Sequence, residues 1–349
     1  MFKKILLSAT LMAAATAFAA DLPSVKILAT GGTIAGTAAS STQTTGYKAG
    51  DLGIQTLIEA VPAMKDYANV SGEQVVKISS NNMDTKTLLK LAKRVNELLA
   101  DPKVDAVVIT HGTDTLEETA YFLNLVTKSD KPVILVGAMR PATAISADGP
   151  MNLLEAVRVA STPEAKGKGV MIVMNDEING ARDVTKTNTT NPATFKSPEL
   201  GAMGYVSGNK VRFYKQSTKR YTTNSEFDVS KLETLPRVDI IYSHVDDDRI
   251  MADAAVAAGA KGIIHAGTGN GSIANPTMEG LKDAVAKGVV VVRSARVPNG
   301  ATTVSLPMWT KAGFLESDTL NPQKARLLLQ LALTKTQDPK EIQRMFDQY

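Results

Sequence analysis

The sequence predicts an α/β protein with two domains. Short apolar runs rich in Val and Ile alternate with helix-like runs almost throughout the chain. Such nearly continuous apolar strands are typical of parallel sheets that are covered on both faces. The chain has 349 residues, 44% of them hydrophobic, and a chain of this length is expected to divide into two domains. We therefore expect a larger N-terminal sheet, mostly parallel and flanked by helices, and a smaller C-terminal, flavodoxin-like parallel sheet.

The individual elements follow from local patterns of apolar residues. Strands are predicted at residues 25–29, 106–110, 133–137, 170–174, 238–242, 262–265 and 289–293. Residues 87–100 are predicted to form a helix, because their leucines and other apolar residues recur with a period of 3.6. Two further helices, at 321–335 and 339–347, are predicted to close the chain.

The N-terminus is predicted to be a signal peptide, residues 1–19. Lys3 and Lys4 precede an alanine-rich apolar run that contains the small-x-small pattern Ala17-Phe18-Ala19. The run is too short to favour a transmembrane helix, so we expect export to the periplasm and no membrane contact afterwards.

The remaining chain is expected to divide where its composition changes. A polar stretch at about 185–229 contains only short strand-like pieces, and regular alternation resumes at residue 235. We expect an N-terminal domain at 20–215, a linker at 216–235 and a C-terminal domain at 236–349.

Composition argues against several classes of site and partner. The sequence has no cysteine, which removes disulfides and thiol nucleophiles and fits an oxidising, exported location. Its three histidines form no i, i+4 pair, which argues against zinc. Losing residues 1–19 lowers the net charge from +4 to +2, and no basic patch indicates nucleic-acid binding.

The first candidate site is the run ILATGGTIAG at residues 27–36, where a predicted strand ends. Gly31 and Gly32 permit a sharp backbone turn. Thr33 follows this turn directly, as expected of a nucleophile whose position is fixed by the backbone. Two other interpretations stay open. Thr33 fits a turn residue that binds local amides, or part of a dinucleotide loop, although it stands where G-x-G-x-x-G requires its second glycine.

The second candidate site is the run VVITHGTDTLEETA at residues 107–120. It has the same form: an apolar strand, then glycine and threonine, then a helix-like run. Ligands of open α/β sheets bind outside the carboxyl ends of the strands. Thr33 and Thr113 are therefore predicted to meet over one pocket, in an arrangement suited to attack on a carbonyl.

The residues around Thr113 carry further expectations. Thr115 and Glu118 have the spacing of a capping box. Asp114 then precedes a helix N-terminus, which favours its ionised form, and it either holds a substrate ammonium or supports the cap. His111 is expected to be a hydrogen-bonded structural residue rather than a base.

A threonine nucleophile needs an activating group, because its hydroxyl is almost wholly protonated at neutral pH. The sequence shows no readable Ser-His-Asp arrangement and no G-x-S-x-G elbow. A lysine is the remaining activator, and Lys186 follows the predicted strand at 170–174 and could fold back over the sheet. Taken alone, Lys186 fits a surface lysine better.

Taken together, the motifs resemble those of bacterial type II L-asparaginases and the related glutaminase-asparaginases. The resemblance covers residues 25–349. It rests on ILATGGTIAG, GEQVVKISS, THGTDTLEETAYFLNL, GAMRPATAISADGPMNL, RDVTKTNTT, HAGTGNGS and LNPQKARLLLQLALTKTQD. It implies hydrolysis of L-asparagine to L-aspartate and ammonia, with L-glutamine as a second substrate, through an acyl-enzyme and without a metal or organic cofactor.

The resemblance also implies roles for single residues. Thr33 would be the nucleophile, and Tyr47 would assist it from a loop that closes over the substrate. In a second cluster, Lys186 would support Thr113, and Asp114 would bind the substrate's α-ammonium.

The rest of the substrate site follows from the same resemblance. Ser80 would bind the α-carboxylate, and Gly32 would line the substrate site. Backbone amides near Thr33 and Thr113 would stabilise the oxyanion. The family forms homotetramers with sites between subunits, so Ser272 would reach a neighbour's substrate.

Two departures from the family pattern lie in the implied pocket. Asn81 stands where the family usually has Gln. The Asn side chain is shorter by one methylene, which predicts weaker binding of the substrate. Pro307 stands where the family has an acid, and residues 304–310 contain no carboxylate. Because of this second departure, a periplasmic amino-acid-binding protein with little or no turnover stays open as an alternative.

Overall fold

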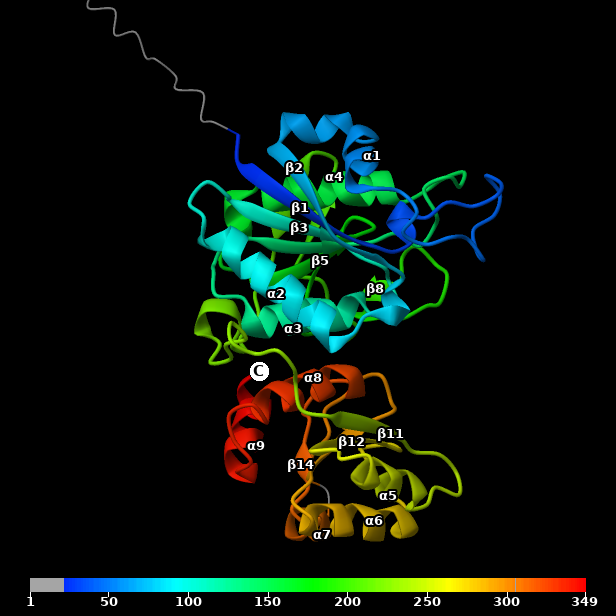
Figure 1. Cartoon of the computed structure of the whole chain (residues 1–349), viewed down its shortest axis with the longest axis vertical. Helices are drawn as coiled ribbons and strands as arrows, with labels where there is room; N and C mark the ends of the chain where they lie inside the picture. The colour runs from blue at the N-terminus through cyan, green and yellow to red at the C-terminus, as the bar shows by residue number, and fades with distance from the viewer. Residues whose placement is uncertain (1–21, 305) are drawn as a thin grey trace, which may run out of the picture.

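The computed structural model describes residues 22–304 and 306–349 and consists of two α/β domains placed end to end (Figure 1). The predicted signal peptide lies outside these described residues. The chain passes between the domains through residues 214–237, where the short 3₁₀ helix η5 (Thr222–Asn224) is the one regular element. None of the helices in the described ranges is long and apolar enough to cross a membrane.

The N-terminal domain is built on an eight-stranded sheet with the order β10-β9-β6-β5-β4-β3-β1-β2. Its strands are β1 (Ser24–Gly31), β2 (Asn69–Ile78), β3 (Ala106–Thr110), β4 (Val133–Val136), β5 (Val170–Met174), β6 (Glu177–Gly180), β9 (Gly204–Ser207) and β10 (Lys210–Phe213). Strands β2, β1, β3, β4 and β5 are parallel, and β6, β9 and β10 join them antiparallel. The mostly parallel sheet that the sequence predicts is confirmed.

The parallel part of this sheet reverses its strand order between β1 and β3. The chain adds β2 on one side of β1 and then β3, β4 and β5 on the other, which gives the order 2-1-3-4-5. Loops that leave two adjacent strands in opposite directions open a crevice between them at the carboxyl edge, and ligands of such sheets bind there. The two threonine motifs follow these two strands.

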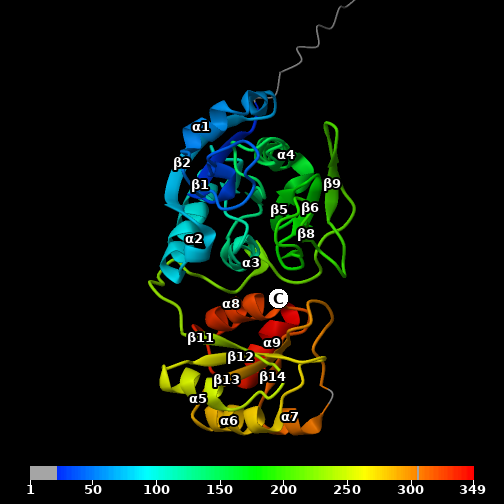
Figure 2. The same cartoon turned by 90° about the vertical axis from the view of Figure 1, so that its right-hand side faces the viewer.

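Helices cover both faces of the N-terminal sheet (Figures 1 and 2). They are α1 (Ile54–Glu59), α2 (Thr85–Ala100), α3 (Leu116–Val126) and α4 (Gly149–Ala160), with 3₁₀ helices η1 (Thr33–Ala35), η2 (Pro62–Asp66), η3 (Ser80–Asn82) and η4 (Pro163–Ala165). Helix α2 buries the predicted leucine-rich stripe and starts two residues earlier than predicted, because the Asp84 side chain caps it through the Thr87 N–H. A small hairpin, β7 (Thr185–Lys186) with β8 (Phe195–Lys196), lies apart from the main sheet.

The C-terminal domain has a four-stranded parallel sheet whose strands follow chain order. The strands are β11 (Val238–Tyr242), β12 (Gly262–Gly267), β13 (Val290–Ala295) and β14 (Leu315–Glu316). The helices are α5 (Ile250–Ala257), α6 (Asn275–Ala286), α7 (Pro307–Lys311), α8 (Pro322–Ala332) and α9 (Pro339–Gln348). The smaller parallel sheet and the two closing helices are confirmed, with α8 shorter than the range 321–335.

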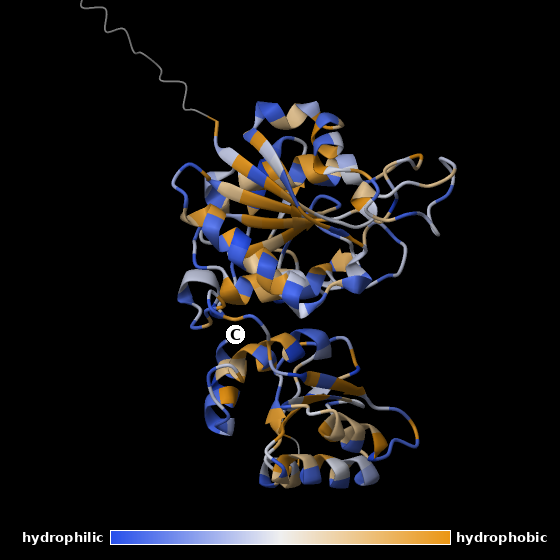
Figure 3. Cartoon of the chain, viewed as in Figure 1, coloured by the Kyte–Doolittle hydropathy of each residue, from blue (hydrophilic) through white to orange (hydrophobic). Residues whose placement is uncertain are grey.

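Helix α8 joins the two domains through one continuous core. It packs against α3 of the N-terminal domain and against β11 and β12 of its own (Figure 2). Leu327 and Leu328 of α8 are buried in the same cluster as the N-terminal sheet. Figure 3 shows the apolar strands inside each domain and the polar residues on the outer helix faces. The domains are thus held by apolar burial, which is the dominant favourable term in folding.

Candidate active site

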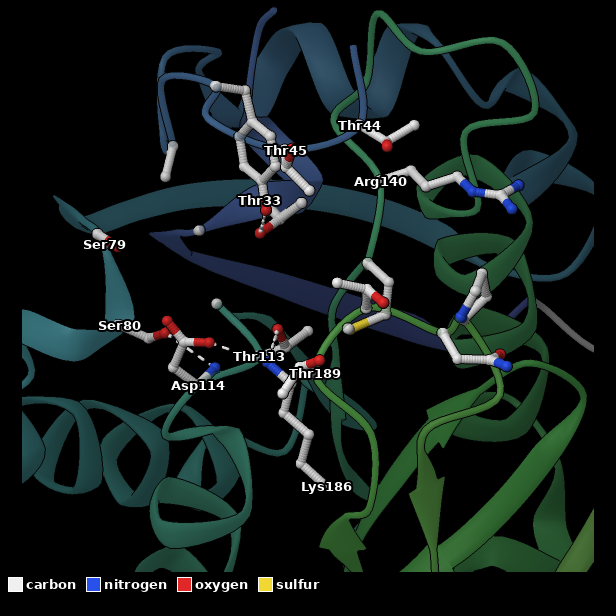
Figure 4. Close-up of a pocket in the computed structure, with 18 of the residues that line it drawn as sticks. Thr33, Thr44, Thr45, Ser79, Ser80, Thr113, Asp114, Arg140, Lys186 and Thr189 are labelled. Atoms are coloured by element: carbon white, nitrogen blue, oxygen red, sulfur yellow. Dashed lines mark hydrogen bonds and ion pairs between the residues drawn. The ribbon is translucent and has the colours of Figure 1, made fainter. Parts of the chain in front are cut away.

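A pocket of about 790 Å³ lies over the carboxyl edge of the N-terminal sheet, at the reversal between β1 and β3. The loops after four parallel strands line it, together with hairpin strand β7. These segments contribute Thr33 after β1, Ser80 after β2, Thr113 and Asp114 after β3, Arg140 after β4, and Lys186. Figure 4 shows Thr33 on one side of the pocket and Ser80, Thr113 and Asp114 on the other.

Glycines allow these loops to meet through their backbones. Gly32 has a φ of 81°, and a Cβ built on it would lie 2.3 Å from the backbone of Gly112. A Cβ on Gly112 would lie 2.5 Å from the Ser80 Oγ. Real Cβ atoms do not approach so closely, so any side chain at either position would push the loops apart. The glycines of both motifs therefore set the width of the pocket.

Thr33 is paired with a tyrosine from a long loop. Its hydroxyl lies 2.7 Å from the Tyr47 hydroxyl, and the Thr33 residue is 7% exposed. The loop folds back on itself, because Thr37 and Lys48 exchange backbone hydrogen bonds of 3.0 and 2.9 Å. Its base is tied by Asp51, which accepts from the Thr37 hydroxyl at 2.7 Å and pairs with Lys48 at 2.6 Å. These two partners, Lys48 first, lower the pKa of the Asp51 carboxyl.

Thr113 is paired with a lysine from the β7 hairpin. The Lys186 ammonium donates to the Thr113 hydroxyl at 3.0 Å and to the Asp114 carboxylate at 2.9 Å. Thr113 is buried, whereas the Asp114 side chain is 58% exposed and faces the pocket. The Asp114 backbone N–H donates to the Ser80 hydroxyl at 3.2 Å, which ties the loops after β2 and β3 together.

The capping box predicted for α3 is wrong. Thr115 occupies the N-cap position, but its side chain makes no cap hydrogen bond. Its hydroxyl instead donates to the Ser80 carbonyl at 2.8 Å. The loop after β2 packs directly against the start of α3 and offers this acceptor, which competes with the local backbone. Burial and the neighbouring Glu117 raise the pKa of the Glu118 carboxyl.

His111 is structural, as predicted. It is completely buried, with its ring nitrogens 2.7 Å from the Gly112 carbonyl and 2.9 Å from the Thr119 hydroxyl. Burial lowers the pKa of His111 to about 4, so the ring is neutral near pH 7. It fixes the backbone just before Thr113 and lies outside the pocket.

Two family profiles match the chain over almost all its described length. One, described as "Asparaginase, N-terminal", matches residues 24–219, and the other, "Glutaminase/Asparaginase C-terminal domain", matches residues 237–346. The chain belongs to the asparaginase family.

Relatives within the family match the chain closely. An L-asparaginase 2 of Bacillus subtilis (strain 168) is 59% identical over 94% of this chain and 87% of its own. An L-asparaginase 2 of Escherichia coli (strain K12) is 50% identical over 100% and 99% of the two chains. The solved structure of a probable cytoplasmic L-asparaginase from Campylobacter jejuni superposes with a TM-score of 0.92 at 53% identity, covering 94% of this chain and 100% of that one.

Two residues that the asparaginase resemblance implies do not reach this pocket. Asn81 is exposed, and its amide points to the Asn82 side chain at 3.4 Å. Ser272 is exposed in the C-terminal domain, between β12 and α6. Its expected place is the pocket of a neighbouring copy, which a single chain does not contain.

Arg140 lines the pocket and was missed by reasoning from the sequence. Its guanidinium donates to the Ser146 carbonyl at 2.9 Å. The signal was present, because Arg140 follows the strand predicted at 133–137, whose carboxyl end lies at the same sheet edge. Among residues 22–304 and 306–349, no group of three or more His, Cys, Asp or Glu side chains is placed to hold a metal ion.

Proposed function

We propose that this asparaginase-family protein hydrolyses the side-chain amide of L-asparagine to L-aspartate and ammonia, with L-glutamine as a second substrate. Relatives named L-asparaginase 2, and one named glutaminase-asparaginase from Pseudomonas fluorescens biotype A that is 48% identical, support this. One observation carries the proposal: two threonine hydroxyls, each with its own proton partner, lie in one pocket with a carboxylate.

Thr33 is the proposed nucleophile. Its Oγ1 attacks the amide carbon as its proton passes to the Tyr47 oxygen, 2.7 Å away, and the Tyr47 hydroxyl gives its own proton onward to the leaving nitrogen. The tetrahedral intermediate collapses as the C–N bond breaks, and the nitrogen takes up a proton and leaves as ammonia. Water then attacks the acyl carbon, which releases L-aspartate and returns the proton to Thr33.

Lys186 is the hydrogen-bond partner of the second threonine, Thr113. Because the Lys186 ammonium donates to the Thr113 Oγ1, the Thr113 proton is free to point elsewhere in the pocket. Thr113 thus donates a hydrogen bond to the reacting amide group or to the attacking water. No acceptor within the described residues takes the backbone N–H of Thr33 or of Thr113, so both amides can receive the oxyanion.

Asp114 and Ser80 hold the far end of the substrate in this proposal. The Asp114 carboxylate is exposed to the pocket and suits the α-ammonium of an amino acid. The Ser80 Oγ already accepts from the Asp114 N–H, which leaves its own proton to donate to the α-carboxylate. The α-ammonium of a free amino acid thus meets a carboxylate, and its α-carboxylate meets a hydrogen-bond donor.

The second wall of the site is proposed to come from a neighbouring copy in a homotetramer. The loop that carries Ser272 is rigid, because the buried Arg293 donates to the carbonyls of Asn270 at 2.7 Å and Gly271 at 3.2 Å. Arg293 also donates to the Thr303 carbonyl at 3.3 Å. The same arginine therefore holds the chain just before the segment that lacks the family acid. Without that acid we expect slower turnover, on the order of 10²–10⁴-fold.

The periplasm is the proposed location. A lysine pair followed by an apolar run and Ala17-Phe18-Ala19 supports export. A relative from Haemophilus influenzae, 53% identical, carries the name of a probable periplasmic L-asparaginase. The domain division at about residues 216–235 is likewise our proposal.

A coupled ammonia assay on asparagine and glutamine tests the proposed function. The mature chain is expected to release ammonia, and Thr33→Ala is expected to lose both activities by at least about 10³-fold while keeping its melting temperature. Asparagine binding without ammonia release would instead support the amino-acid-binding alternative. Full activity in Thr33→Ala would reject Thr33 as the nucleophile.

A further inference from the structure

Glu117 lies outside the pocket, yet its carboxylate joins three elements behind the active site. It is the second residue of α3 and is 5% exposed. Its Oε2 accepts from the Thr185 hydroxyl at 2.9 Å and from the Lys186 backbone N–H at 2.7 Å. Its Oε1 accepts from the Asn321 amide at 2.9 Å and the Gln323 amide at 2.8 Å.

Apart from the Thr185 hydroxyl, which also lies 3.1 Å from Oε1, the partners of the two oxygens belong to two different domains. Oε2 holds β7, the strand whose Lys186 side chain reaches the pocket. Oε1 holds the first turn of α8, which belongs to the C-terminal domain and packs against α3 (Figure 2). A buried carboxylate with this many donors is held in one orientation, because each lost hydrogen bond would leave a buried polar group unpaired.

Helix α8 holds the same segment at a second point. Lys324 is completely buried, and its ammonium donates to the carbonyls of Arg182, at 2.8 Å, and Val184. The Asn321 Oδ1 accepts from the Lys324 N–H at 3.1 Å and so caps α8. This cap fixes which way the Asn321 amide points, with its nitrogen toward Glu117.

We propose that Glu117 is a positioning residue that links the docking of α8 to the placement of the Lys186 ammonium. The C-terminal domain then supports the reaction within its own chain, from behind the sheet, in addition to any residue it offers a neighbouring copy. This inference rests on the proposed role of Lys186.

Exchanging the carboxylate and the amide between positions 117 and 321 tests the link between α8 and Lys186, and the exchange leaves the net charge unchanged. In Glu117→Gln the one remaining side-chain oxygen can take the place of Oε2 and accept from β7. The new NH₂ group then takes the place of Oε1 and faces the Asn321 NH₂, which the cap prevents from turning. In Asn321→Asp a second carboxylate faces Glu117. In the double variant, one oxygen of the carboxylate introduced at position 321 caps α8. Its other oxygen accepts from the amide introduced at position 117, while the Gln323 amide can rotate.

We expect each single variant to lower kcat on asparagine by about 10- to 100-fold, because small displacements of catalytic groups have effects of this size. KM should change less than kcat. The double variant should recover to within about threefold of the parent. A purely structural role would lower the melting temperature of the single variants and leave the kcat of the folded protein unchanged.

Three outcomes would overturn the inference. They are a normal kcat in folded Glu117→Gln, a normal kcat in folded Asn321→Asp, and two impaired singles without recovery in the double. If Glu117→Gln does not fold, Gln323→Leu removes one α8 donor and leaves the cap intact. Its kcat should then fall about threefold, and an unchanged kcat would count against the link.

Lys186→Met separates this inference from the proposed function. If Lys186→Met keeps full kcat, the proposed role of Lys186 is wrong. If Lys186→Met loses activity and the Glu117 and Asn321 variants do not, the link to α8 alone is wrong.

Discussion

The two halves of the pocket hold their threonines in different ways. Thr33 depends on Tyr47, which stands on a surface loop. This loop pairs with itself through Thr37 and Lys48, and it is also hydrogen-bonded to residues 142–145 in the loop after β4. Thr113 depends on Lys186, whose strand is fixed by Glu117 between the two domains. The first partner stands on a loop that is hydrogen-bonded to other loops and to β2, whereas the second partner is part of the domain interface. We infer that the first half admits and covers the substrate and the second half stays fixed.

Of the two partner residues, the one in the fixed half is expected to have the larger effect. Lys186→Met removes the donor to both Thr113 and Asp114 while keeping a side chain of similar length. We expect kcat on asparagine to fall about 10³-fold, within the range usual for lost proton-transfer support. Steady-state ammonia release measures it.

Lys196→Met is the matched control for Lys186→Met. Lys196 stands on the partner strand of the same hairpin, opposite Thr185, and does not line the pocket. Its kcat should match the parent. Equal losses in both variants would mean that the hairpin as a whole, rather than the Lys186 ammonium, supports the reaction.

A smaller effect is expected in the mobile half. Tyr47→Phe keeps the ring and removes the hydroxyl 2.7 Å from Thr33. We expect kcat to fall about 10²-fold, less than for Lys186→Met, because water can reach this open side and carry the proton. Tyr214→Phe, which changes an exposed tyrosine that does not line the pocket, is the control for the hydroxyl. A loss larger than that of Lys186→Met would reverse the ranking of the two halves.

The sequence predicts the position of both threonines because the signal is local. Continuous Val and Ile runs define β3, β5 and β11 to the residue, and glycines follow β1 and β3 directly. Once these strands are taken as parallel, their carboxyl ends must share an edge. Thr33, Thr113 and Asp114 could therefore be assigned to one pocket from the sequence alone. Lys186 needed the family resemblance as well, because its own surroundings in the sequence fit a surface lysine.

Features that depend on distant segments could not be predicted in this way. The Thr115 hydroxyl turns to the Ser80 carbonyl, 35 positions earlier, instead of capping its own helix. Glu117 binds Asn321, 204 positions later, and nothing in either local sequence indicates the pair. The short antiparallel strands β6 and β9 were missed as well, since four-residue runs with mixed polarity carry little periodicity.

A substitution at Asn81 tests whether the rim of the pocket, the exposed chain beside Ser80, takes part in substrate binding. Asn81→Gln introduces the longer side chain that the family resemblance implies at this position, and we expect KM for asparagine to fall about fivefold. This is the low end of the effect of one methylene, because Asn81 is exposed and outside the pocket. Asn82→Gln, one residue further from Ser80, is the control. An unchanged KM in Asn81→Gln would show that this rim plays no part in binding.

The smallest effect is expected at the base of the mobile loop. Asp51→Asn keeps the shape but removes the charge that pairs with Lys48, next to Tyr47, and weakens the bond from Thr37. Because exposed ion pairs are weak, we expect kcat/KM to fall only about threefold. Thr37→Val removes the other partner, and a double-mutant cycle isolates their coupling. If the two changes act through one closed loop, kcat/KM of the double variant should be no lower than that of the more impaired single variant. Additive losses would mean that Asp51 and Thr37 act separately, and that loop closure does not depend on this contact.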